Sequence, residues 1–187
     1  MAFSVSSLMV MVMIFSSPIS SFSCDLPQSL DVGKQETLTV LGQMGRISPF
    51  SCLNDRTDFR LPWEMEDGSQ VQKAQVLSVL HETLQQMFNL LHTEGSSAAW
   101  NTTLLDQLRS GLHHQLEDLE TCLLQETGEA ESLLTLEGPV LAVRRYFQGI
   151  RLYLQEKKHR EVVRVELRRC FLFVKVLTRK LRKLGGN

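Results

Sequence analysis

The sequence lacks the motifs that most enzyme active sites need. It contains no Gly-x-Ser-x-Gly elbow, no phosphate-binding loop and no dinucleotide-binding fingerprint. His81 and Glu82 begin like a zinc-protease helix, but Gln85 stands where the second histidine must be. His113 and His114 are adjacent, so on a helix they point about 100° apart and do not easily bind one metal ion. We therefore expect no enzyme, no metal and no cofactor, and a solvated or helix-capping role for each histidine.

Long hydrophobic runs are also missing, because the apolar stretch from Leu8 to Phe15 is too short to span a membrane. This stretch lies in residues 1–23, which contain no charged side chain, and small residues precede Cys24 as a signal peptidase requires. A bacterial lipoprotein leader would also be cut before a cysteine, but Ser21 stands where that leader needs an aliphatic residue. The sequence thus predicts a secretory signal peptide over 1–23 and a secreted mature domain over 24–187 with no transmembrane segment.

Cysteine is scarce, and acidic charge is scarce at one end of the chain. The four cysteines are too far apart for a redox Cys-x-x-Cys motif, although a secreted protein can form disulfides.

The net charge is -1, yet from Lys157 to Asn187 there are eleven of the 20 basic residues and two of the 21 acidic ones. One function that this basic tail leaves open is a secreted module that binds heparan-type glycans or anionic membrane surfaces. We expect no nucleic-acid partner.

Apolar residues recur at helical spacing, and no alternating run supports a sheet. We interpret these stripes as core and predict an all-α protein. The five predicted helices carry stripes over Leu30–Met44, Val76–Leu91, Leu105–Leu123, Val140–Leu154 and Val163–Leu184.

The lengths of the connections predict the topology. The segment from Gly45 to Ser69 is long enough to run along a helix and return, which permits the first two helices to be parallel. A second long connection runs from Gln125 to Pro139. Only Lys158 to Arg160 separates the last two helices, and so short a link makes them antiparallel. We expect a five-helix bundle of the up-up-down-down type with a long first crossover loop, an arrangement that is also found in helical cytokines.

A resemblance to type I interferons extends in collinear order over nearly all of the mature chain. The segments that carry it are Cys52–Phe59 with Pro62, Val79–Glu94, Ser96–Trp100, Leu104–Cys122, Arg144–Gln148, Leu152–Leu154 and Glu161–Arg164. The match is closest to the alpha/omega/tau branch, and the departures from it suggest a divergent relative such as the delta subgroup. The resemblance implies a monomeric secreted cytokine that bridges the two chains of the interferon-alpha/beta receptor. Bridging would bring receptor-bound Janus kinases together and start antiviral transcription through STAT proteins.

The resemblance also implies two receptor-binding surfaces, although each residue set could instead be a solvated helix face. The surface for the tighter-binding chain would contain Leu53, Arg56, Asp58, Arg164, Val165, Arg168 and Arg169. The surface for the second chain would contain Phe88, Asn89, Leu104, Arg109, His113 and Arg144.

The cysteines depart from the family pattern. We predict a Cys24–Cys122 disulfide, which would close a long loop and contribute roughly 4–5 kcal/mol in the chain-entropy model. Family members usually pair the cysteine at the position of Cys52 with one shortly before the fifth helix. That cysteine is absent here, and Cys170 occurs further along the chain. A Cys52–Cys170 disulfide would restore the link by another route; the alternative is a buried free thiol at Cys170.

Asn101-Thr102-Thr103 is the only glycosylation acceptor in the sequence. It precedes the third predicted helix, where a glycan can face solvent. We predict glycosylation at Asn101, and the alternative is an unmodified helix cap.

Overall fold

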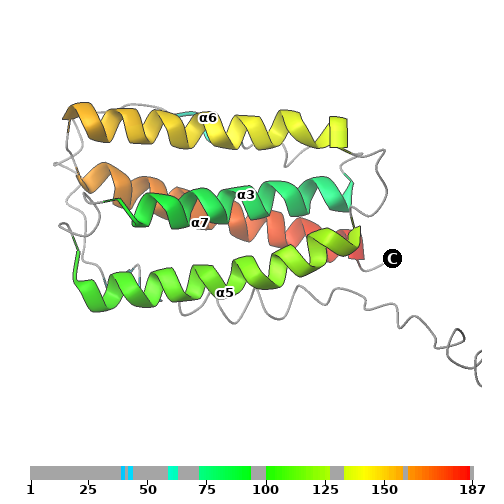
Figure 1. The fold of residues 1–187 in the computed structure, drawn as a ribbon, viewed down its shortest axis with the longest axis horizontal. Coiled ribbons are helices and arrows are strands. Elements are labelled where there is room, and N and C mark those ends of the chain that lie inside the picture. The colour runs from blue at the N-terminus through cyan, green and yellow to red at the C-terminus, as the bar shows by residue number, and fades with distance from the viewer. Residues whose placement is uncertain are drawn as a thin grey trace, which may run out of the picture.

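The computed structural model describes residues 39–40, 42–43, 59–62, 72–93, 100–126, 133–157 and 160–185. This part of the chain contains four long helices and no strand, which confirms the all-α prediction (Figure 1). The helices are α3 (Lys73–Leu91), α5 (Thr102–Glu126), α6 (Leu133–Lys157) and α7 (Arg160–Gly185).

The first predicted helix is described only at residues 39–40 and 42–43, which are helical. The rest of that helix, the signal peptide over 1–23 and most of the first crossover loop lie outside the described residues. The count of five helices and the parallel first pair therefore remain predictions.

The four described helices alternate in direction along the bundle (Figure 1). Lys73 at the start of α3 pairs with Glu126 at the end of α5, so these two helices are antiparallel. Glu82 and Gln86 of α3 bond to Arg144 and Arg151 of α6 in the same order, as expected of parallel helices. α6 and α7 run in opposite directions, as the short connection between them predicted.

The start of α6 differs from its prediction. Gly138 and Pro139 indicated the end of a connection, with a helix from Val140 onward, but α6 begins at Leu133 and contains Pro139. Proline removes one backbone hydrogen bond, and this loss falls only about two turns into a helix of 25 residues. The stabilisation from the later turns outweighs the lost hydrogen bond, because the helix from Val143 onward buries a continuous stripe of apolar side chains.

α3 is the central helix, in contact with α5, α6 and α7. Its predicted stripe is confirmed, since Val76, Leu77, Leu80, Leu84 and Met87 are fully buried. Burial of each such side chain contributes about 1.5–3 kcal/mol. The bundle therefore holds its surface side chains on a rigid frame. No helix in the described part of the chain combines the length and hydropathy that crossing a membrane requires.

The cysteines of the described residues have different fates. Cys122 is disulfide-bonded. Cys24, its expected partner, lies outside the described residues, so that pairing remains a prediction. Cys170 is a free, fully buried thiol, and the Cys52–Cys170 disulfide is not formed in the structure. The physical reason is that Cys170 lies on the buried side of α7, among core residues that separate it from the surface.

Candidate binding surfaces

Residues of the first predicted set lie together on the first turns of α7. Arg164, Val165, Arg168 and Arg169 occupy positions i, i+1, i+4 and i+5, which form one side of a helix. Arg168 is exposed and the other three are partly exposed. We call these four residues the α7 surface. Leu53, Arg56 and Asp58, the loop members of the set, lie outside the described residues.

The described residue that follows Asp58 is packed against α6. The ring of Phe59 lies edge-on to Tyr146 at 6.4 Å and to Tyr153 at 5.7 Å between centroids. Gly149 makes room for this contact, because a Cβ atom there would lie 3.3 Å from the Phe59 ring. The end of the loop segment is thus anchored beside the part of α6 that contacts the first half of α7.

A buried polar cluster beneath the α7 surface was missed at the level of sequence. Glu166 is only 4% exposed, and it accepts a short hydrogen bond from the Tyr146 hydroxyl. Its other oxygen accepts a bond from Arg169 Nη1 at 3.2 Å. The Cys170 thiol donates to the Tyr146 hydroxyl at 3.6 Å. The cluster joins α6 to α7 and fixes the direction of Arg169.

Burial determines the protonation of this cluster. It raises the pKa of the Cys170 thiol to about 12, although the hydrogen bond with Tyr146 opposes the shift. It also raises the pKa of Tyr146, and the Glu166 carboxylate adds to that effect. Both groups are therefore neutral at physiological pH, and the thiol is unreactive because the thiolate is the nucleophile.

The second predicted set lies on α3, α5 and α6, and we call it the α3–α5–α6 surface. The Phe88 ring stacks on His113 of α5 at 6.1 Å and contacts His92 at 4.3 Å. Leu104 is partly buried against the core, whereas Asn89 and His113 are exposed. The Phe88 ring thus links the exposed sides of α3 and α5.

Two arginines of this set also have structural contacts. Arg109 Nη2 donates to the backbone oxygen of Leu91 at 2.7 Å, which satisfies a carbonyl at the end of α3. Arg144 forms two bonds of 3.0 Å to the two oxygens of Glu82, a bidentate ion pair between α6 and α3. The Arg144 side chain is nevertheless 59% exposed, so its outer side faces solvent.

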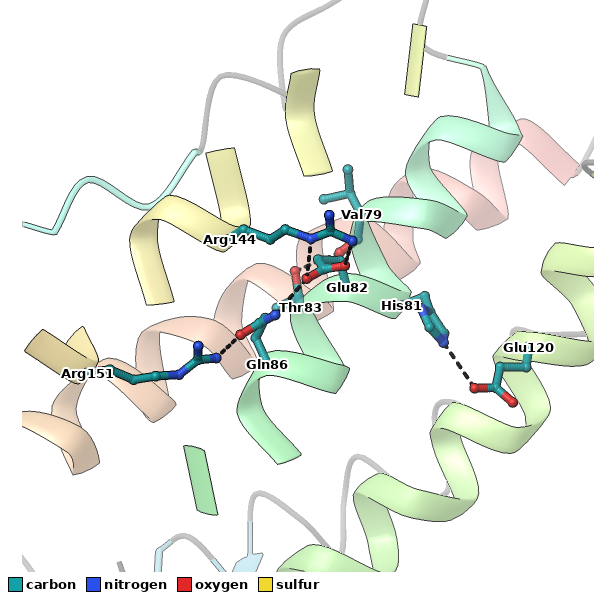
Figure 2. A network of polar contacts seen from close by, with 8 residues as sticks. All are labelled: Val79, His81, Glu82, Thr83, Gln86, Glu120, Arg144 and Arg151. Atoms are coloured by element: carbon teal, nitrogen blue, oxygen red, sulfur yellow. Dashed lines mark hydrogen bonds and ion pairs between the residues drawn. The ribbon is translucent and has the colours of Figure 1, made fainter. Parts of the chain in front are cut away.

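The Glu82–Arg144 pair belongs to a larger network along α3 (Figure 2). Gln86 donates to Glu82 at 2.7 Å and accepts a bond from Arg151 of α6. Burial alone would raise the pKa of Glu82, but the bonds from Arg144 and Gln86 and the Arg144 charge lower it below the ordinary value. Glu82 is therefore an ionised, nearly buried carboxylate held by its partners.

The two surfaces face away from each other. α3 and α7 contact each other through their buried sides. The exposed residues of α3, such as Asn89, therefore point away from α7. Arg168 on the exposed side of α7 points away from α3. A protein of this size can thus present two separate surfaces to two partners at once.

A bundle of long helices is the architecture that helical cytokines share with other all-α proteins. The interferon alpha/beta domain matches residues 26–181 of the chain. Interferon omega-1 of horse (Equus caballus) is 65% identical over 91% of this chain and 90% of its own length. Human interferon omega-1 is 56% identical over 94% of this chain and 92% of its own length. Interferon tau of red deer (Cervus elaphus) is 53% identical over 100% of this chain and 98% of its own length.

The chain therefore belongs to the interferon alpha/beta family, the type I interferons. This confirms the resemblance on which the two sets of surface residues were predicted. Its relatives are interferon cytokines, a family that is not enzymatic.

Proposed function

We propose that this interferon is a secreted monomer that binds the two chains of the interferon-alpha/beta receptor and triggers Janus kinase/STAT antiviral signalling. The observation that supports the proposal is that the α7 surface and the α3–α5–α6 surface lie on opposite sides of one helical bundle. Two receptor chains could then contact the protein simultaneously without colliding.

The tighter-binding chain would contact the α7 surface together with Leu53, Arg56 and Asp58. Arginines beside a small apolar residue such as Val165 suit an interface hot spot, because a planar guanidinium forms several bonds once water is excluded. The second chain would contact the α3–α5–α6 surface, where the partly buried Phe88 ring stacks on the exposed His113. Aromatic side chains lose little conformational entropy on binding.

A reporter of interferon-stimulated transcription, measured in cells with and without the receptor, tests this proposal. Wild-type protein should activate the reporter only in receptor-bearing cells. A Phe88→Ala/His113→Ala variant should still bind the tighter chain but signal weakly, and it should compete with the wild type. Arg168→Ala should weaken binding to the tighter chain itself. Equal signalling in receptor-deficient cells would refute the proposal.

We further propose that Asn101 carries a glycan in the mature protein, which begins at Cys24 after cleavage of residues 1–23. Asn101 is exposed, and its Oδ1 atom accepts bonds from the backbone amides of Thr103 and Leu104 at 2.9 and 3.3 Å. The cap uses the oxygen, and a glycan is attached to the nitrogen, so the two roles are compatible.

Thr103→Ala tests the glycan without disturbing the cap, because the cap bond comes from the backbone of residue 103. Protein secreted by mammalian cells should lose mass on amidase treatment, and the Thr103→Ala variant should not. An unchanged mass of the wild type would show that Asn101 serves only as a cap.

A further inference from the structure

The exposed side of α7 carries a straight stripe of positive charge. Successive residues of a helix are rotated by about 100°, which places six cations within an arc of roughly 100° around the axis. With a rise of about 1.5 Å per residue, the stripe is about 28 Å long. These residues, here called the basic stripe, are Arg164, Arg168, Lys175, Arg179, Arg182 and Lys183.

Four of the six cations of the stripe have no ion-pair partner in the part of the chain that the structure describes. Within the described residues, Arg168, Lys175, Arg179 and Lys183 form no ion pair. The acidic residue of α7 whose side chain is described, Glu166, points into the core and is held by Tyr146 and Arg169. Cations on a low-dielectric frame create a positive potential that attracts a polyanion.

We propose that the basic stripe binds a linear sulfated glycan of the heparan type. A straight row of cations about 28 Å long fits an extended chain with anionic groups along its length. Arginine forms bidentate bonds to sulfate oxygens as it does to carboxylates and phosphates, and lysine contributes point charge. This interaction goes beyond receptor binding and does not depend on it.

The packing of α7 distinguishes this ligand from an anionic membrane. A helix that lies in a membrane interface buries an apolar side in the lipid. The apolar side of α7 is already buried in the bundle, including Leu167, Val174, Leu177 and Leu181. Leu172, at 50% exposure, is the large hydrophobic residue that interrupts the stripe. Phe171 and Phe173 are buried as well, so they offer no platform on which nucleic-acid bases could stack.

The stripe extends beyond the α7 surface, which allows the two functions to be separated. Arg164 and Arg168 belong to both, whereas Lys175, Arg179 and Lys183 lie about two to four turns further along the helix. A variant with Lys175→Gln, Arg179→Gln and Lys183→Gln keeps the whole α7 surface. Arg145→Gln provides a matched control for Arg179→Gln, because Arg145 is an exposed arginine on α6.

The test is binding of the mature protein to immobilised heparin over a range of salt concentrations. Each removed charge should weaken binding about fivefold at low salt, so the triple variant should lose about a hundredfold. Arg179→Gln should elute at lower salt than the wild type, whereas Arg145→Gln should elute at the same salt concentration as the wild type. Desulfated heparin should bind none of the proteins, and binding of the triple variant to the receptor ectodomain should be unchanged.

Three outcomes would overturn the proposal. The first is elution of the triple variant with the wild type, and the second is equal weakening by Arg145→Gln and Arg179→Gln. The third is tighter binding of the wild type to phosphatidylserine vesicles than to heparin, which would assign the stripe to membranes. Unchanged circular dichroism and melting temperature of Arg179→Gln would show that its effect is not unfolding. If the wild-type protein binds heparin but does not activate the reporter, the proposed receptor function is contradicted and the heparin proposal is not.

Discussion

The two sides of the bundle use arginine in different ways. On the α3–α5–α6 surface, Arg109 and Arg144 are bonded to groups of a neighbouring helix. On the exposed side of α7, Arg168 and Arg179 form no ion pair within the described residues. Arginine therefore bonds to a neighbouring helix at positions 109 and 144, whereas Arg168 and Arg179 remain available for a partner. Exposure alone does not separate the two roles, since Arg144 is 59% exposed.

The largest effect that we expect separates binding from stability on the α7 side. Arg164→Ala and Arg56→Ala should each cost roughly 1–4 kcal/mol of affinity for the tighter-binding receptor chain, as hot-spot arginines do. Their free energy of unfolding should change by no more than about 0.5 kcal/mol, as is usual for substitutions of charged side chains outside the core. Surface plasmon resonance with the receptor ectodomain and thermal unfolding measure the two quantities. Full affinity in both variants would refute the assignment of this surface.

The next effect concerns the buried cluster beneath that surface. Tyr146→Phe removes the hydroxyl that donates to Glu166 and leaves this buried carboxylate with fewer partners. The free energy of unfolding should fall by about 1–3 kcal/mol, which denaturant titration measures. Tyr153→Phe is the control, since Tyr153 also contacts Phe59 but does not bond to Glu166. Equal losses in the two variants would show that the bond to Glu166 contributes no more stability than a buried tyrosine hydroxyl without that bond.

A smaller loss is expected on the opposite side. Arg144→Ala should destabilise the fold by about 1–2 kcal/mol, less than a fully buried pair would because Arg144 is largely exposed. Arg168→Ala, the matched change on the unpaired side, should stay within about 0.5 kcal/mol of wild type. Urea unfolding at neutral pH measures both. A larger loss of stability in Arg168→Ala than in Arg144→Ala would show that arginine stabilises the fold on the α7 side rather than on the α3–α5–α6 surface.

The same pair predicts a pH dependence. The pKa of Glu82 is lower in the folded protein than the ordinary value of 4.5. Its ionised form thus stabilises the fold above the unfolded-state pKa, and this stabilisation is lost as the pH falls through the folded-state pKa. Between neutral pH and a pH below 4.5, the gap in stability between wild type and Arg144→Ala should therefore narrow. A gap that stays constant would show that the pair contributes through packing alone.

The smallest effect concerns the inner side of α7. Native protein should leave Cys170 almost unmodified by a thiol reagent, because the thiol is fully buried and its pKa is raised to about 12. Denatured, non-reduced protein should expose Cys170 as a reactive thiol. Mass spectrometry of alkylated peptides measures this reactivity. An unreactive Cys170 after denaturation would indicate that Cys170 forms a disulfide, such as the Cys52–Cys170 disulfide, and would contradict the free thiol.

Much of the fold could be predicted from the sequence, because apolar periodicity is a local property. The stripes through Val76–Leu91 and Val163–Leu184 predicted α3 and α7 to within three residues at each end. The start of α6 could not be predicted this way. Gly138 and Pro139 favour a break locally, and only the packing of the whole helix outweighs them.

The candidate surfaces were predicted less completely. Family resemblance named Arg144 and Arg169, and the structure adds that Glu82 and Glu166 hold them. A glutamate in a helical pattern is normally read as solvent-exposed. No sequence signal could have identified these two glutamates as buried. Glu82 pairs with an arginine 62 residues away, and Glu166 has partners on both α6 and α7.

By itself, the sequence determined the helical class, the apolar stripes, the charge asymmetry of the tail and membership of the interferon family. These properties depend on residue order along a short stretch or on similarity over the whole chain. Only the tertiary structure decided which arginines are paired, which carboxylates are buried and that Cys170 is a free thiol. Such properties depend on which helix sides meet, and a buried charge or thiol is determined by neighbours that are distant in sequence.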